Sequence, residues 1–85
     1  MDSKKLEILM TAVNLGSFSK ASEVVGYTQS GLTHMMNSLE KDVGFPLLVR
    51  GRTGVRLTPA GQRIFPLVQE CLNGAKALER EILLI

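Results

Sequence analysis

Cysteine, histidine and tryptophan are scarce in this sequence, and their scarcity argues against several kinds of site. The chain has one cysteine and one histidine, Cys71 and His34, which lie far apart in the sequence, and it has no tryptophan. A single cysteine cannot form a disulfide within the chain, which fits a reducing compartment. A lone His and a lone Cys, without a phosphate loop or a dinucleotide-binding glycine pattern, argue against an active site. We therefore expect no enzyme activity, no catalytic residue, no metal and no cofactor.

Long hydrophobic runs are also missing. No segment approaches the roughly 20 apolar residues that cross a bilayer, and the N-terminus has no signal-peptide core. The expected protein is therefore soluble and cytoplasmic, without contact with a membrane. With 85 residues, 45% of them hydrophobic, the chain has room for one small globular domain.

Acidic residues are absent from one long stretch of the chain. Residues 43–69 contain no Asp or Glu, yet four arginines fall there, Arg50, Arg52, Arg56 and Arg63. The whole chain is nearly balanced, with 10 basic and 8 acidic residues. A segment of one sign in a balanced chain is typical of a localised phosphate-binding surface, although a solvated basic face is the alternative.

Three helices are expected in the first half. Asp2 or Ser3 can cap the first, which Gly16 ends, and Ser17 or Ser19 can cap a short second helix, which ends near Gly26. About three residues then separate the second helix from a third. This spacing, with a glycine in the turn, predicts a helix-turn-helix.

The third helix is expected from Gln29 to about Asp42, with Thr28 as its N-cap and Gly44 just beyond its end. It carries two stripes of side chains at helical spacing. The apolar stripe is assigned to the core and consists of Leu32, Met36, Leu39 and Val43. The polar stripe has Gln29 at its start and continues with Ser30, Thr33, His34 and Asn37. It lacks the Glu and Lys of ordinary solvated faces, and its side chains suit base edges and phosphates in a major groove. A merely polar surface is the alternative.

A β-hairpin and a long helix are expected in the second half. Two β-prone runs flank the segment 51–54, which predicts a small wing at residues 50–54. Thr58 can cap a helix that begins at Pro59 and continues to the end of the chain. Its apolar residues alternate steps of four and three, like a heptad seam, at Ile64, Val68, Cys71, Ala75, Leu78, Ile82 and Ile85. Such a seam is longer than the three-helix core can cover, so a second copy of the helix is the expected partner, with Cys71 as a small buried hydrophobe.

The sequence resembles the N-terminal DNA-binding domain of LysR-type transcriptional regulators. The segments that carry the resemblance are residues 16–21, 29–34, 39–44 and 46–48, Arg50 and residues 57–61. Their order and spacing agree with the family without a gap. It implies a mainly α fold, namely a winged helix-turn-helix of three helices and a two-stranded β wing at residues 1–58. A linker and dimerisation helix follows at residues 59–85. In this family an effector-sensing domain normally follows, and it is expected to lie outside these 85 residues, so a small-molecule effector is expected to act only through that domain.

The resemblance also implies a function and its residues. The chain is expected to bind an interrupted palindromic operator on double-stranded DNA as a homodimer, with the third helix in the major groove. Base contacts are expected from Gln29, Ser30, Thr33 and His34. Contacts to the DNA backbone are expected from Ser17, Lys20, Thr28, Asn37, Arg50 and Arg52.

Three alternatives remain open at this point. The wing arginine Arg50 can instead form an internal ion pair with Glu40 or Asp42 that braces the wing. The cysteine on the seam can be a redox-sensing thiol. A protein-interaction module is the rival class of function. A Glu-rich third helix and a wing without arginines would favour that class, and neither feature is seen in the sequence.

Overall fold

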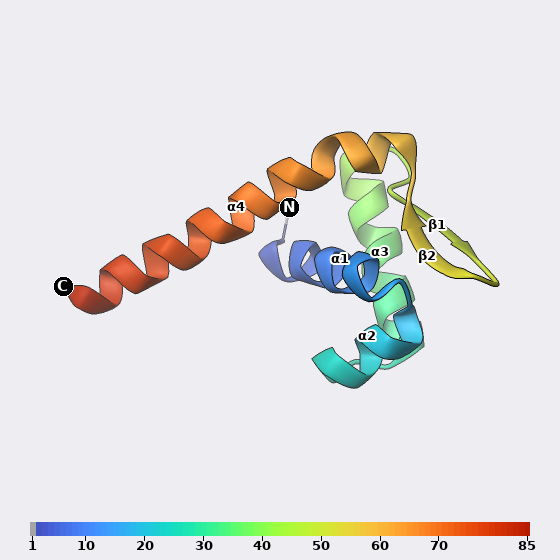
Figure 1. Ribbon diagram of the computed structural model, residues 1–85, viewed down its shortest axis with the longest axis horizontal. Helices are drawn as coiled ribbons and strands as arrows, with labels where there is room; N and C mark the ends of the chain where they lie inside the picture. Colours follow the sequence, from blue (N-terminus) through green and yellow to red (C-terminus); the bar gives the residue numbers. More distant parts are fainter. Residues whose placement is uncertain (1) are drawn as a thin grey trace.

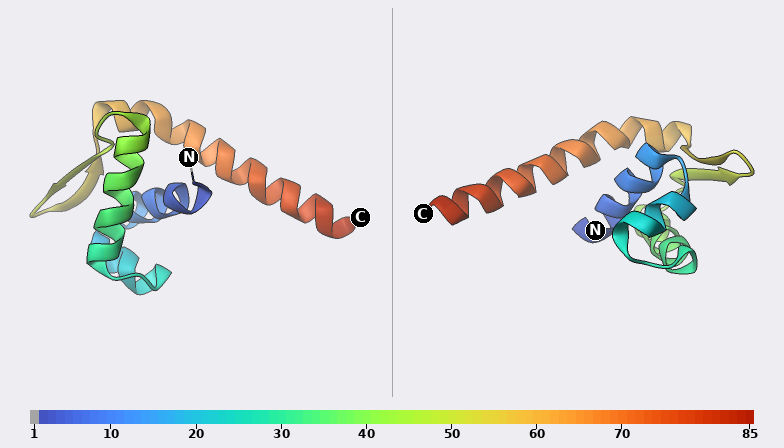
Figure 2. Two further views of the ribbon diagram at one scale, coloured as in Figure 1. Left: turned by 180° about the vertical axis from the view of Figure 1, so that it is seen from behind. Right: turned by 60° about the horizontal axis from the view of Figure 1, so that its bottom comes forward.

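Residues 2–85 are described by the computed structural model, and they form helices around one core, a hairpin, and a long protruding helix (Figure 1). The elements in chain order are α1 (Ser3–Leu15), α2 (Phe18–Val25), α3 (Gln29–Val43), β1 (Leu48–Gly51), β2 (Gly54–Leu57) and α4 (Pro59–Leu84). The predicted winged helix-turn-helix followed by a long helix is therefore confirmed. The hairpin projects from one end of the molecule, and the C-terminal end of α4 lies at the other (Figure 2).

Each helix starts where a short polar side chain caps it. Asp2, Ser17, Thr28 and Thr58 accept hydrogen bonds from backbone N–H groups in the first turns of α1, α2, α3 and α4. These bonds satisfy amides that have no partner within the helix. The first three helices end at glycines in the left-handed conformation, as the sequence predicts.

The core is assembled from one face of each helix together with the segment that enters the wing. Its most completely buried large side chains are Ile8, Leu9, Leu32, Met36, Leu39 and Leu47. Three of the four α3 residues predicted as core, Leu32, Met36 and Leu39, are buried, and the fourth, Val43, packs partly exposed against the core. The apolar stripe of α3 is thus turned inward, which leaves its polar stripe outside.

The wing is attached to the C-terminal end of α1. The backbone N–H of Val55 donates to the carbonyl oxygen of Gly16 at 3.0 Å. Gly54 has φ of 111°, and a Cβ there would collide with the same carbonyl, so only glycine fits this contact. Strand pairing includes Gly51 with Gly54, which leaves Arg52 and Thr53 as the turn, a shorter turn than the predicted segment 51–54.

The first half of α4 packs against the helical core. Thr58 donates from its backbone N–H to Leu47 O at 2.9 Å and from its hydroxyl to Pro46 O at 2.8 Å. A Cβ at Gly61 would collide with the same Leu47 carbonyl, so glycine is what allows this close approach. Farther along, Val68 and Leu72 are buried. The beginning of α4 is therefore an integral part of the domain.

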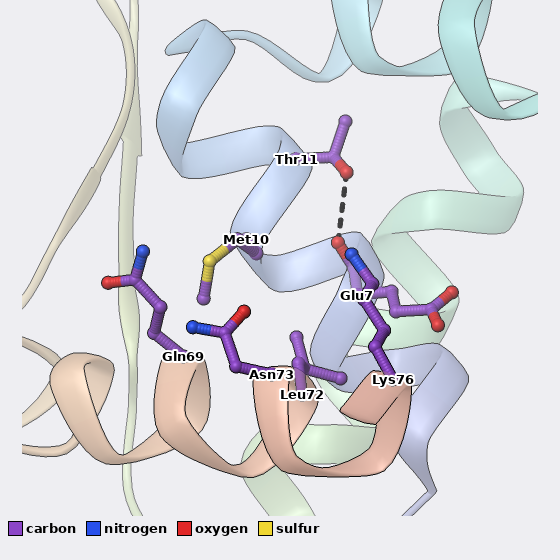
Figure 3. Close-up of a pocket in the computed structure, with 7 residues that line it drawn as sticks. All are labelled: Glu7, Met10, Thr11, Gln69, Leu72, Asn73 and Lys76. Atoms are coloured by element: carbon purple, nitrogen blue, oxygen red, sulfur yellow. Dashed lines mark hydrogen bonds between the residues drawn. The ribbon is translucent and has the colours of Figure 1, made fainter. Parts of the chain in front are cut away.

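A groove separates α1 from α4 beside this contact. Figure 3 shows Glu7, Met10 and Thr11 of α1 facing Gln69, Leu72, Asn73 and Lys76 of α4. Leu72 was not among the predicted seam residues. It is buried because α4 turns the face containing Val68 and Leu72, four residues apart, toward α1.

The predicted seam of α4 divides into two parts. Val68 is buried within the chain and Ile64 packs partly buried against the core. The remaining members are exposed, namely Cys71, Ala75, Leu78, Ile82 and Ile85. Cys71 is thus not buried by its own chain, because the core ends beside Val68 and Leu72, and its predicted burial depends on a second copy of the helix.

Candidate nucleic-acid interface

The turn between α2 and α3 sets the position of the candidate recognition helix. Gly26 ends α2 with φ of 78°, and two residues later Thr28 caps α3 by accepting from Gly31 N at 3.0 Å. The Thr28 hydroxyl also lies 3.2 Å from that of Ser30. The two hydroxyls form a hydrogen bond with each other at the start of α3, where both side chains are exposed.

The predicted polar stripe of α3 lies on the surface. Gln29, Ser30, His34 and Asn37 are exposed, and Thr33 is half-buried. The exposed members present amide, hydroxyl and imidazole groups at helical spacing along one side of the helix. Such groups can donate to and accept from base edges or phosphate oxygens.

The structure brings the start of α3 together with the wing and α2. They line a groove of about 290 Å³ composed of Ser17, Phe18, Ser19, Gln29, Arg50, Gly51, Arg52, Gly54 and Val55. Four of the predicted DNA-contacting residues meet there, namely Ser17, Gln29, Arg50 and Arg52. The others do not line it: Lys20 lies one turn along α2, and Thr33, His34 and Asn37 lie farther along α3.

The electrostatics of this groove favour an anion. Two arginines contribute to its wall, and α2 begins at it with Ser17 as N-cap. Helix N-termini attract anions through their free N–H groups and their partial positive charge. Among the described residues 2–85, no acidic side chain lines the groove. A polyanion backbone laid across α2 and the wing would meet complementary charge.

Arg50 is held by three neighbouring side chains. Its Nη2 donates to Asn37 Oδ1 at 2.9 Å and to Glu40 Oε1 at 3.3 Å. Its guanidinium carbon lies 5.2 Å from the centroid of the Phe18 ring, within cation–π range. The ion pair with Glu40, one of the two partners considered from the sequence, is therefore present.

The other candidate partner of Arg50 is engaged elsewhere. Asp42 Oδ2 lies 3.4 Å from Lys5 Nζ, and this lysine also donates to Ser38 Oγ at 2.7 Å. These contacts join α1 to the C-terminal half of α3. Asp42 therefore supports the packing of the two helices and does not brace the wing.

Sequence reasoning missed part of the role of Glu40 and all of that of Phe18. Glu40 Oε2 accepts from the backbone N–H groups of both Leu47 and Leu48, in addition to the Arg50 contact of Oε1. The signal available in the sequence was a single Glu on a helix otherwise free of Glu, a few residues before the predicted wing. Nothing in the sequence pattern indicates that Phe18 lies under a wing arginine.

The arrangement of three helices and a hairpin, with a polar helix face beside a basic groove, defines a winged helix-turn-helix DNA-binding fold. A family model described as "Bacterial regulatory helix-turn-helix protein, lysR family" matches residues 3–62. The chain therefore belongs to the LysR family of bacterial regulators. This family consists of transcriptional regulators and is not a class of enzymes.

Relatives and solved structures agree with this assignment. The HTH-type transcriptional regulator HdfR of Yersinia pestis (strain Pestoides F) is 31% identical over 83 residues, which cover 98% of this chain and 28% of that protein. The chain thus spans less than a third of the length of this relative. Within residues 2–85, no helix is long and apolar enough to cross a membrane.

Two similar structures are DNA complexes. The CbnR_DBD–DNA complex has a TM-score of 0.89 and 26% identity, covering 95% of this chain and 93% of that chain. The complex of BenM_DBD with catB site 1 DNA has a TM-score of 0.90 and 26% identity, covering 96% of this chain and 92% of that chain. In both cases nearly the whole fold is shared with a DNA-bound domain.

Proposed function

We propose that this chain binds a specific double-stranded DNA sequence, with α3 in the major groove and the wing on the backbone or minor groove. The observation that supports this most strongly is the groove that places Gln29 of α3 beside Arg50 and Arg52 of the wing. A base-reading amide and two phosphate-binding guanidinium groups are needed side by side when a helix enters a groove flanked by phosphates.

The proposed role of each DNA-contacting residue follows from its position on the surface. Gln29 at the start of α3 can form two hydrogen bonds with adenine, and Ser30, Thr33 and His34 follow it along the helix. The backbone contacts are assigned to Ser17, Lys20, Thr28, Asn37, Arg50 and Arg52. Thr33 is only half exposed, so its contact would be made by a part of the side chain.

The protein is further proposed to act as a homodimer on an interrupted palindromic operator. Leu78 and Ile82 are each 61% exposed, and Ile85 is fully exposed. Beside the inner end of this seam, a groove with almost wholly apolar walls is lined by Leu6, Val43, Phe45, Ile64, Leu67, Val68 and Cys71. A second copy of α4 would remove both apolar surfaces from water, and two copies would read two half-sites.

The wider biological role is inferred from the family. We propose a cytoplasmic transcription regulator in which residues 1–58 bind DNA, residues 59–85 link and dimerise, and a further domain senses a small-molecule effector. HdfR, whose length the chain covers only in part, is named as a transcriptional regulator, which supports this arrangement.

Selection from a pool of random duplex DNA tests the proposal. The purified chain should enrich a motif with two related half-sites, and its affinity for that motif should fall steeply with salt as counterions are released. Salt-sensitive binding without any enriched motif would contradict sequence-specific recognition by this chain. A failure to bind DNA at low salt would contradict the proposal as a whole.

A further inference from the structure

We propose that Glu40 and Asn37 are positioning residues that orient Arg50 for contact with a DNA phosphate. The recognition helix α3 would thus fix the orientation of an arginine side chain of the wing. This inference rests on the proposed DNA-binding function. It assigns a role to Glu40, an acidic residue near a surface that is otherwise expected to attract DNA.

One carboxylate links α3 to two successive parts of the wing. Oε2 of Glu40 accepts from the backbone amides of Leu47 and Leu48, where β1 begins, while Oε1 accepts from Arg50 at 3.3 Å. The Glu40 side chain is 18% exposed, so the bonds are partly shielded from water. Shielded, charge-assisted hydrogen bonds are stronger than exposed ion pairs and define geometry better.

The contacts leave part of the Arg50 guanidinium available. Both hydrogen bonds, to Asn37 and to Glu40, are donated by the same nitrogen, Nη2. Among residues 2–85, Nε and Nη1 of Arg50 make no hydrogen bond, and the side chain remains 30% exposed. Phe18 lies beside the guanidinium, and the groove that Arg50 lines also contains Gln29 and Arg52.

Fixing the plane of a guanidinium matters for phosphate binding. Arginine binds phosphate through N–H groups in a rigid fork, and a free side chain loses considerable rotamer entropy when it binds. With Nη2 held by α3 and the plane held beside Phe18, this loss occurs during folding and not during binding. Because both acceptors are on α3, the position of the phosphate contact is also fixed relative to the helix that meets the bases.

The substitution Glu40→Gln tests the proposal because electrostatics and positioning predict opposite results. An amide of the same shape retains an acceptor oxygen for the Leu47 and Leu48 amides but removes the negative charge that pairs with Arg50. If charge alone mattered, removing a carboxylate near DNA would strengthen binding. The positioning role predicts weaker binding, by roughly three- to tenfold for any duplex sequence. It also predicts a salt slope smaller by up to about 0.9, the value of one phosphate contact.

The same substitution in an Arg50→Ala background separates positioning from a purely structural role. Affinity for a selected duplex and for a random duplex is measured at two salt concentrations for the wild type, both single variants and the double variant, with thermal unfolding recorded for each. We expect Glu40→Gln to weaken binding only while Arg50 is present. Asn37→Ala should weaken binding more in the wild type than in the Arg50→Ala chain, because the backbone contact proposed for Asn37 itself is lost in both.

Two results would overturn the proposal. If Glu40→Gln leaves binding unchanged or strengthens it, Arg50 is not positioned by Glu40 for DNA contact. If it weakens binding equally without Arg50, Glu40 acts only by holding the Leu47 and Leu48 amides. A wild-type chain that binds neither duplex would contradict the proposed DNA-binding function itself, which is a different outcome from either.

Discussion

Gln29 stands at the first position of α3, exposed and on the wall of the groove shared with the wing. At such a position the side-chain amide can approach a base edge before the helix axis moves away from the groove floor. We expect Gln29→Ala to reduce discrimination at one base pair of each half-site by about 1–3 kcal/mol, while affinity for random DNA changes little.

The check is a competition assay against duplexes that carry every single-base change in a selected half-site. Gln62→Ala provides a matched control, because this glutamine is exposed on α4, away from the groove. If the base preference of Gln29→Ala equals that of the wild type, Gln29 does not take part in base recognition.

Gly61 and Gly74 provide a second residue-scale comparison within one helix. A Cβ at Gly61 would collide with the Leu47 carbonyl oxygen and lie 3.1 Å from Leu57 Cδ2, whereas a Cβ at Gly74 would meet nothing within 4 Å. Gly61→Ala should therefore lower the free energy of unfolding by about 1–3 kcal/mol. Gly74→Ala should raise it by up to about 1 kcal/mol, since alanine is the better helix former.

Chemical denaturation of the two variants beside the wild type gives both values. A tolerated Gly61→Ala would mean that α4 shifts easily against the segment before the wing, so the close approach would not be needed for the fold. The effect of Gly74 follows from the sequence alone, because glycine inside any helix is less favourable than alanine. The sequence could not predict the constraint at Gly61, which arises from a carbonyl 14 residues earlier in the chain.

At the scale of single elements, the wing turn consists of Arg52 and Thr53, and Arg52 lines the groove. Unlike Arg50, Arg52 makes no hydrogen bond or ion pair among residues 2–85. Its guanidinium is thus available to a phosphate. We expect Arg52→Ala to weaken binding to all sequences and to reduce the slope of log affinity against log salt by about 0.9.

Salt titrations by fluorescence anisotropy test this expectation. Arg80→Ala serves as the control because it removes the same charge from an exposed position on the C-terminal part of α4. The C-terminal end of α4 lies at the opposite end of the molecule from the hairpin (Figure 1). Equal slopes for wild type and Arg52→Ala would place Arg52 away from the phosphates.

The elements themselves could be predicted closely from the sequence because their signals are local. Capping residues and glycines marked the ends of α1, α2 and α3, and the apolar stripe of α3 identified its buried face. The contacts between elements were not predictable in the same way. The stacking of Phe18 on Arg50 joins residues distant in sequence and leaves no periodic pattern.

At the scale of the whole molecule, α4 extends beyond its own core and exposes Leu78 and Ile82. The heptad pattern of the sequence does not distinguish seam residues that pack within the chain from those that remain open. Val68 belongs to the first group, and the C-terminal members belong to the second. The prediction of a dimer therefore concerns chiefly the exposed part of the seam.

Leu78→Gln together with Ile82→Gln should shift the chain from dimer to monomer without unfolding it. Both side chains are 61% exposed, so little of the single-chain core is lost. Replacing Ala77, exposed on the opposite side of α4, by Gln adds an equally neutral polar group as the control. Sedimentation equilibrium reports the association state, and a double variant that still dimerises would show that the seam is not the interface.

The most direct test of the whole account compares the affinity of the wild-type chain for its selected duplex and for a scrambled duplex of the same composition at the same salt concentration. Recognition of bases by α3, with the wing on the backbone, predicts a preference on the order of a thousandfold. Tight but equal binding of both duplexes would contradict the central claim, because phosphate contacts alone would then account for the affinity.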